Sequence, residues 1–168
     1  MVPKIWSNNF YEYGPMSIEK VLFRYDGIDI TFVCLNSKCK RYICHCTDAI
    51  SETSWLVTEV TNLELVDLIT NSVHINDLFK RKKDVILAEK ESGEMKYTVF
   101  HEGNIPNNEL PDDNYTISYS DEAYMQLLES QNIVLFPTKS GATGRSTRIT
   151  KFRRINVADR ANNNKARG

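Results

Sequence analysis

Short runs of β-branched and aromatic residues, separated by turn residues, fill the first third of the chain. They predict four consecutive strands at residues 21–25, 28–35, 41–47 and 55–60. Asp26-Gly27, between the first two strands, is a common two-residue hairpin turn. Sequential strands at this spacing indicate an antiparallel meander.

The apolar spacing then changes from the period of a strand to that of a helix. Residues 62–69 predict a helix, with Thr61 or Asn62 as its cap. Asn76 is expected to cap a second, shorter helical turn that carries Leu78 and Phe79 into the core.

The second half of the chain predicts a further hairpin and a third helix. Strands at 85–89 and 95–101 flank the turn Ser92-Gly93. A long acidic loop at 103–114 follows. The remaining expected elements are a short strand at 115–119, a helix at 120–130 and a last short strand at 133–136.

These elements predict an α+β fold: an antiparallel β-meander with two or three short helices packed on one face. We expect residues 1–138 to form a single acidic domain. Residues 139–168, rich in glycine, serine and asparagine, are expected to form a disordered, flexible basic arm. The aromatic residues Trp6, Phe10, Tyr11 and Tyr13 predict that the N-terminal segment, residues 1–15, packs on this domain.

Charge divides the chain in the same place. Residues 139–168 contain nine basic residues and one acid, whereas residues 1–138 contain twelve basic residues and twenty-one acids. The formal total of −1 therefore averages an acidic body at −9 and a basic arm at +8. Such a molecule can hold an anion at one end and repel it at the other.

The arm combines positive charge with an aromatic side chain. Lysine and arginine neutralise phosphates, and Phe152 is able to stack on an exposed base. We therefore consider nucleic-acid binding by Arg145, Arg148, Lys151, Phe152, Arg153, Arg154 and Arg160. Two other interpretations stay open: the arm binds an acidic protein partner, or it binds neither and folds back on the acidic body.

The acidic loop suggests a binding surface of the opposite sign. Glu109, Asp112 and Asp113 lie close together in it, and we expect them to contact a basic protein partner.

Four cysteines, Cys34, Cys39, Cys44 and Cys46, lie within thirteen residues and include His45 in their span. Thiolate and imidazole are the ligands that zinc prefers, but the spacing Cys-x4-Cys-x4-Cys-His-Cys is not that of common zinc knuckles.

The strand register decides whether these thiols converge. A turn at Ser37-Lys38 pairs Leu35 with Lys40, which places Cys34 on the opposite face from Cys44 and Cys46. We therefore predict buried core thiols and no metal site. A slip of one residue in register reverses this conclusion, so a metal site and a redox role stay open.

The chain contains no complete catalytic motif. His45, His74 and His101 lack the neighbours of known hydrolase and metalloprotease motifs, although an assembly of Cys46 with His101 is not excluded. Residues 140–147 differ from a phosphate-binding loop, because their glycines are three apart and Arg145 replaces the lysine. We predict that the protein is not an enzyme and uses no cofactor.

No apolar run approaches the roughly 18 residues of a membrane-spanning helix. Residues 1–9 show no apolar signal segment. We therefore expect a cytoplasmic protein without a membrane partner.

Five segments resemble a group of small bacterial proteins classified only as a domain of unknown function. They are 22–27 (Leu-Phe-Arg-Tyr-Asp-Gly), 30–34 (Ile-Thr-Phe-Val-Cys), 41–44 (Arg-Tyr-Ile-Cys), 55–57 (Trp-Leu-Val) and 75–79 (Ile-Asn-Asp-Leu-Phe). The resemblance covers about residues 21–91. It implies a bacterial or phage-derived cytosolic protein, and it carries no activity or catalytic residue to this chain.

From these observations we expect a non-catalytic macromolecular interaction module with a protein partner. The resemblance suggests a small accessory protein in a bacterial defence, toxin-neutralising or phage counter-defence setting. The alternative is a nucleic-acid-binding protein that acts through its basic arm.

Overall fold

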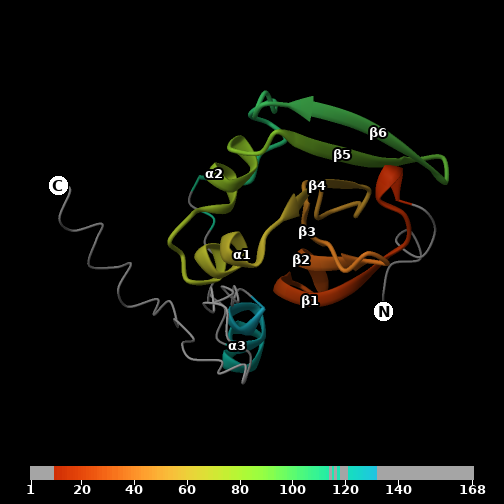
Figure 1. The fold of residues 1–168 in the computed structure, drawn as a ribbon. Coiled ribbons are helices and arrows are strands. Elements are labelled where there is room, and N and C mark those ends of the chain that lie inside the picture. Colours follow the sequence, from red (N-terminus) through yellow and green to blue (C-terminus); the bar gives the residue numbers. More distant parts are fainter. Residues whose placement is uncertain (1–9, 114, 116, 118–120, 132–168) are drawn as a thin grey trace, which may run out of the picture.

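The computed structural model describes residues 10–113, 115, 117 and 121–131. Six strands form one antiparallel sheet in the order β1-β2-β3-β4-β5-β6 (Figure 1). Their bounds are β1 Met16–Tyr25, β2 Ile28–Asn36, β3 Arg41–Cys46, β4 Ser54–Val60, β5 Asp84–Glu91 and β6 Glu94–His101. The predicted antiparallel meander is confirmed.

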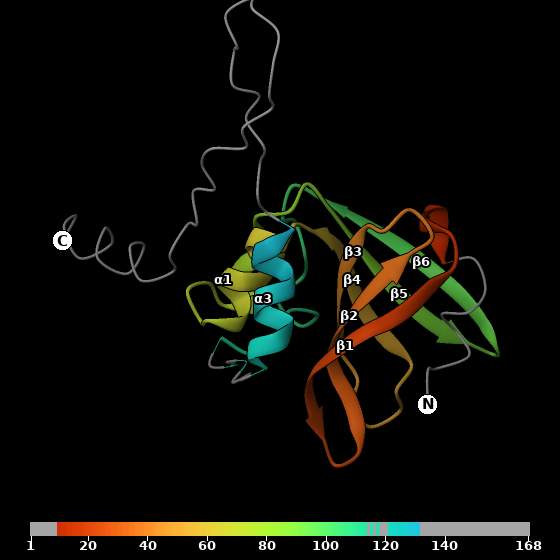
Figure 2. The same ribbon diagram turned by 60° about the horizontal axis from the view of Figure 1, so that its bottom comes forward.

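Three short helices complete the α+β fold: α1 Asn62–Ile69, α2 Ile75–Lys80 and α3 Glu122–Ser130. They gather on one side of the sheet, and α3 lies beside α1 and close to β1 (Figure 2). A 3₁₀ turn, η2 (Tyr11–Tyr13), lies on the opposite side, near β5 and β6.

Two of the three helices begin with a side-chain cap. Thr61 caps α1 through a capping box with Glu64, and Asp121 caps α3 by accepting the N–H of Tyr124. The predicted cap at Asn76 is wrong, because α2 begins after His74 and Asn76 lies inside it. Asn76 is buried and points to the acidic loop instead of the helix end.

The strands predicted after the acidic loop have different outcomes. Tyr115 and Ile117 are not in a strand, contrary to the strand expected at 115–119. The strand predicted at 133–136 and the basic arm at 139–168 lie outside the described residues.

The sheet carries apolar side chains on both faces. One face forms a helix-side core with α1, α2 and α3. Its members from the sheet are Leu22, Val33, Ile43, Leu56, Val60, Val85 and Leu87. The other face forms an aromatic core, whose buried members are Phe10, Met16, Ile30, Phe32, Cys34, Tyr42, Cys44, Cys46, Trp55, Val57, Ile86 and Ala88. All six residues of β3 are buried, so this strand lies between the two cores.

Phe10, Tyr11 and Tyr13 cover the aromatic core, as expected, whereas Trp6 lies outside the described residues. The ring of Phe10 lies edge-on to Tyr97 of β6 at 5.2 Å, and Tyr13 stacks on Tyr42 of β3 at 4.5 Å. The segment before β1 therefore bridges the middle and the last strand of the sheet.

A bulge in β1 directs a carboxylate to the helix side of the sheet. Ile18 pairs with Cys34 and Lys20 with Val33, so Glu19 is an extra residue without its own strand partner. Its two carboxylate oxygens accept hydrogen bonds from Nε and Nη2 of Arg41, each at 2.7 Å. This bidentate ion pair joins β1 to β3.

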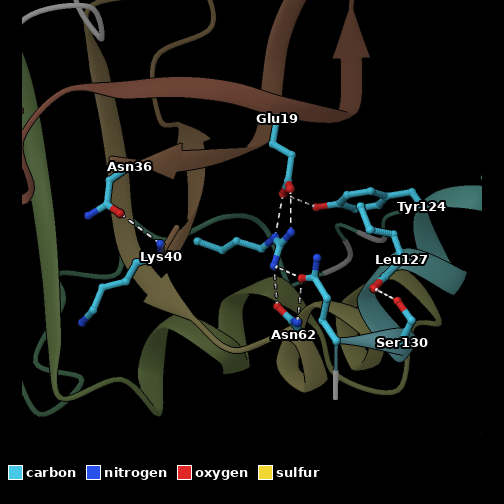
Figure 3. Close-up of polar contacts among 9 residues, drawn as sticks. Glu19, Asn36, Lys40, Asn62, Tyr124, Leu127 and Ser130 are labelled. Atoms are coloured by element: carbon cyan, nitrogen blue, oxygen red, sulfur yellow. Dashed lines mark hydrogen bonds and ion pairs between the residues drawn. The ribbon is translucent and has the colours of Figure 1, made fainter. Parts of the chain in front are cut away.

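Both helices beside this ion pair contribute to it. Arg41 Nη1 donates to Asn62 Oδ1 of α1 at 2.9 Å and to Gln131 Oε1, at the end of α3, at 2.7 Å. Figure 3 shows the Tyr124 hydroxyl pointing to Glu19, to which it donates at 2.9 Å. Glu19, Arg41, Asn62, Tyr124 and Gln131 form what we call the Arg41 network.

We predict that Arg41→Met destabilises the protein by about 2–3 kcal/mol. Methionine keeps most of the packing of the arginine stem but leaves Glu19 with an uncompensated charge. The figure lies near the low end for a broken buried pair, because the Glu19 side chain retains 17% of its exposure. Urea unfolding of the two proteins measures the difference.

A matched control is Arg24→Met, which removes the ion pair between Arg24 of β1 and Asp29 of β2, in which the Arg24 side chain is 57% exposed. It should change the unfolding midpoint much less than Arg41→Met, because solvent screens the pair. The double variant Glu19→Gln/Arg41→Met should recover part of the lost stability. Equal midpoints for Arg41→Met and Arg24→Met would contradict a structural role of the Arg41 network.

Candidate functional site

A shallow, open hollow lies at the end of the sheet where β3 leads into β4 and β5 leads into β6. Three parts of the chain meet there: the β3–β4 loop, the end of β5 and the acidic loop. The lining residues are Thr47, Asp48, Thr53, Ser54, Glu89, Lys90, Glu91, Asn108 and Glu109. Pairing of Ser54 with Glu89 brings the first two parts together.

Negative charge dominates this acidic hollow. Its lining contains four carboxylates and one ammonium group. Glu91 forms an ion pair with Lys96 of β6. Hydrogen bonds from Ser51 hold the pKa of Asp48 below its usual value, so this carboxylate stays ionised at neutral pH. The hollow therefore attracts cationic groups.

The β3–β4 loop at the rim is held by its own hydrogen bonds. Asp48 Oδ1 accepts the N–H groups of Ile50 and Ser51 at 3.1 and 3.2 Å, and the carbonyl of Asp48 accepts the N–H of Glu52 at 2.9 Å. Ile50, between these contacts, is 98% exposed. The loop thus presents an apolar side chain in a fixed backbone beside the acidic hollow.

The three residues predicted to bind a partner separate in the structure. Glu109 lines the acidic hollow. Asp113 accepts a hydrogen bond from Nδ2 of Asn76 at 2.8 Å, and the carbonyl of Asp112 accepts the N–H of Tyr115 at 2.9 Å. Asp112 and Asp113 thus help to fix the acidic loop and do not line the hollow.

Sequence reasoning missed the other side of this hollow. Asp48 and Glu89 are distant from Glu109 in sequence and line the same hollow only because of the strand pairing and the return of the acidic loop. The one available signal was the acidic pair Glu89 and Glu91 at the end of a predicted strand.

A second polar cluster lies within the sheet. His45 and Thr31 pair across β3 and β2 and are both buried. His45 Nδ1 lies 2.9 Å from Thr31 Oγ1, which lies 2.8 Å from the hydroxyl of Tyr115. Burial lowers the pKa of His45 to about 4, so the ring is neutral at pH 7. We call Thr31, His45 and Tyr115 the His45 relay.

The predicted register of β2 and β3 is wrong by one residue. Leu35 pairs with Arg41, not with Lys40, and Cys34 pairs with Tyr42. The hairpin loop has three residues and ends at Cys39 in the left-handed region, at φ 58°. Asn36 closes the loop by accepting the N–H groups of Lys38 and Lys40 on its side chain.

This slip places Cys34, Cys44 and Cys46 together in the aromatic core, contrary to the expectation that Cys34 faces the other way. His45 points to the opposite face, and Cys39 is exposed in the hairpin loop. In the described part of the chain, no group of three or more His, Cys, Asp or Glu side chains is placed to hold a metal ion. We therefore do not assign these cysteines as metal ligands.

The structure also separates the considered pair Cys46 and His101. Cys46 pairs with Trp55 of β4, which pairs with Ala88 of β5, which in turn pairs with Tyr97 of β6. His101 lies four residues further along β6. The thiol of Cys46 donates to the carbonyl of Asp48 at 3.2 Å, whereas His101 pairs with Asp84.

The residues considered for nucleic-acid binding lie outside the described residues: Arg145, Arg148, Lys151, Phe152, Arg153, Arg154 and Arg160.

Comparisons with known proteins return no match. No family model, no curated protein and no solved structure is significantly similar to this chain. Among the helices of the described residues, none is long and apolar enough to cross a membrane.

We predict that one of the four thiols reacts with a thiol reagent in the native protein, and that this thiol is Cys39. Cys34 and Cys44 are fully buried and Cys46 is 4% exposed. Burial raises the pKa of Cys44 and raises that of Cys46 to about 11, so neither is a thiolate at pH 8. Absorbance after mixing with Ellman's reagent measures the reacting thiols.

The variant Cys39→Ser should abolish the native reaction, and all remaining thiols should react after unfolding in urea. Rapid labelling of a second thiol in the native wild-type protein would contradict the burial of the aromatic core.

Proposed function

We propose that the protein is a non-catalytic macromolecular interaction module that binds a basic surface of a protein partner at the acidic hollow. One observation carries this proposal: three separate chain segments bring four carboxylates around one hollow, next to the exposed Ile50.

The rim and the hollow supply complementary parts of a binding surface. A buried apolar anchor surrounded by charged groups is a common arrangement in protein interfaces, where charge gives orientation and on-rate. The hydrogen bonds of Asp48 already hold the backbone of Ile50 and Ser51. Binding therefore costs less loop ordering than it would for a flexible segment.

The setting of this module is also a proposal. We infer a bacterial or phage-derived accessory protein that acts in defence, toxin neutralisation or counter-defence. This inference is based on the resemblance of residues 21–91 to bacterial proteins of unknown function. The nine basic residues of residues 139–168 support a second candidate, nucleic-acid binding through the arm.

Charge reversal in the hollow tests the leading proposal. We expect Glu89→Lys/Glu109→Lys to weaken capture of the partner roughly tenfold and to flatten its salt dependence, because attraction to cationic groups is lost. The full chain is immobilised and exposed to host lysate with and without nuclease, and the captured protein is identified and titrated at increasing salt.

Two further variants separate the candidates. Glu12→Lys/Glu122→Lys makes the same charge change at exposed positions outside the hollow and should leave capture intact. Neutralising Arg148, Lys151, Arg153 and Arg154 to Gln in the full chain tests the arm. Capture that survives the hollow reversal but is lost with nuclease or with the arm variant would replace the proposal by nucleic-acid binding.

A further inference from the structure

The His45 relay connects the sheet to a part of the chain that is not in the sheet. Thr31 and His45 lie on adjacent central strands and are held by the strand pairing. Tyr115 follows the acidic loop and is half-buried. Its hydroxyl reaches Thr31, and its ring lies edge-on to His45 and to Phe23, each at 5.2 Å between ring centres.

Each of the three groups has a hydrogen bond while His45 is neutral. The Tyr115 hydroxyl donates to Thr31 Oγ1 and the Thr31 hydroxyl donates to Nδ1, or both bonds run in the reverse direction. Burial raises the pKa of Tyr115 to about 12, so its hydroxyl keeps its proton across the physiological range. The relay is thus satisfied without any charge.

Among the described residues, none compensates the charge that a proton on His45 introduces. Those that face His45 are neutral: Thr31 on β2, Leu56 opposite it on β4, and Tyr115, which contacts Phe23 of β1. Burial is the cause of the lowered pKa, and among the described residues no charged side chain contributes to it. A buried imidazolium without a partner is strongly unfavourable unless water reaches it.

Of the three residues that cover the His45 ring, Tyr115 can be displaced with the least disruption of the fold. Thr31 and Leu56 are fully or nearly fully buried in paired strands, so their displacement disrupts the sheet. Displacement of Tyr115 breaks one hydrogen bond and two ring contacts and opens His45 to water.

We propose that the His45 relay is a pH-sensitive latch that holds Tyr115 over His45 while His45 is neutral, and releases Tyr115 when His45 is protonated. The latch is a property of the fold and does not depend on the proposed partner.

The direction and size of the response follow from the two protonation equilibria. The pKa of His45 is about 4 in the closed form and returns toward 6.5 when the ring meets water. The closed form, in which Tyr115 covers His45, therefore has its full stability above about pH 6.5. This stability decreases as the pH falls from about 6.5 toward 4. With these values the closed-to-open ratio falls roughly 20-fold between pH 7 and pH 5.

NMR of the full chain at pH 7 and pH 5 tests the latch through the ring signals of Tyr115, which lies edge-on to His45 and Phe23. We expect these ring contacts to weaken at pH 5, as the closed-to-open ratio falls roughly 20-fold, whereas the amides of β3 and β4 keep their protection from hydrogen exchange. His45→Gln, which stays neutral, should make the Tyr115 signals independent of pH. His101→Gln, on the exposed histidine of β6, should leave the pH response as in the wild type.

A direct titration covers the case in which His45→Gln does not fold. The ring signals of His45 in the wild-type protein, followed by NMR, should shift together with those of Tyr115. Tyr115 signals that are the same at pH 7 and pH 5 overturn the latch. So does loss of protection in β3 and β4 at pH 5, or a pH response of Tyr115 that persists in His45→Gln.

Discussion

The burial of β3 on both faces is the constraint on which the rest of the structure depends. Tyr42, Cys44 and Cys46 point into the aromatic core, whereas Arg41, Ile43 and His45 point to the helix side. Two of these six buried residues are strongly polar, and buried polar groups need partners. The fold supplies those partners: Glu19 and the helices α1 and α3 for Arg41, and for His45 its paired neighbour Thr31, which Tyr115 contacts in turn.

The two polar ends of β3 each fix a different distant segment. At one end, Arg41 binds the bulged Glu19, Asn62 and Gln131, and so sets the positions of β1, α1 and α3 together. At the other end, His45 and Thr31 receive Tyr115 from the chain before α3. The chain after β6 therefore crosses from one side of the helix-side core to the other, held by polar contacts at both ends of a single strand.

Local signals predicted the elements well, because strands, turns and caps depend on neighbouring residues. Asp26-Gly27 and the Thr61 cap are of this kind. Register and bulges were not predictable in the same way. One extra residue in the loop before Arg41 moved Cys34 to the other face, and the bulge at Glu19 depends on an arginine that is distant in sequence. The acidic hollow was half predicted: Glu109 follows from composition, but Asp48 and Glu89 reach it only through the tertiary fold.

The acidic hollow and the His45 relay both involve the acidic loop, but separate contacts hold them. Gly103 lies so close to Lys80 that an added Cβ would be 2.1 Å from its carbonyl oxygen, and Asn76 Nδ2 donates to the carbonyl of Pro111. Glu109 lies between these two anchors, and neither anchor involves Tyr115. Displacement of Tyr115 therefore leaves Glu109 at the hollow. Because coupling between two sites requires that one site bias the state of the other, a partner bound at the hollow should leave the pKa of His45 unchanged.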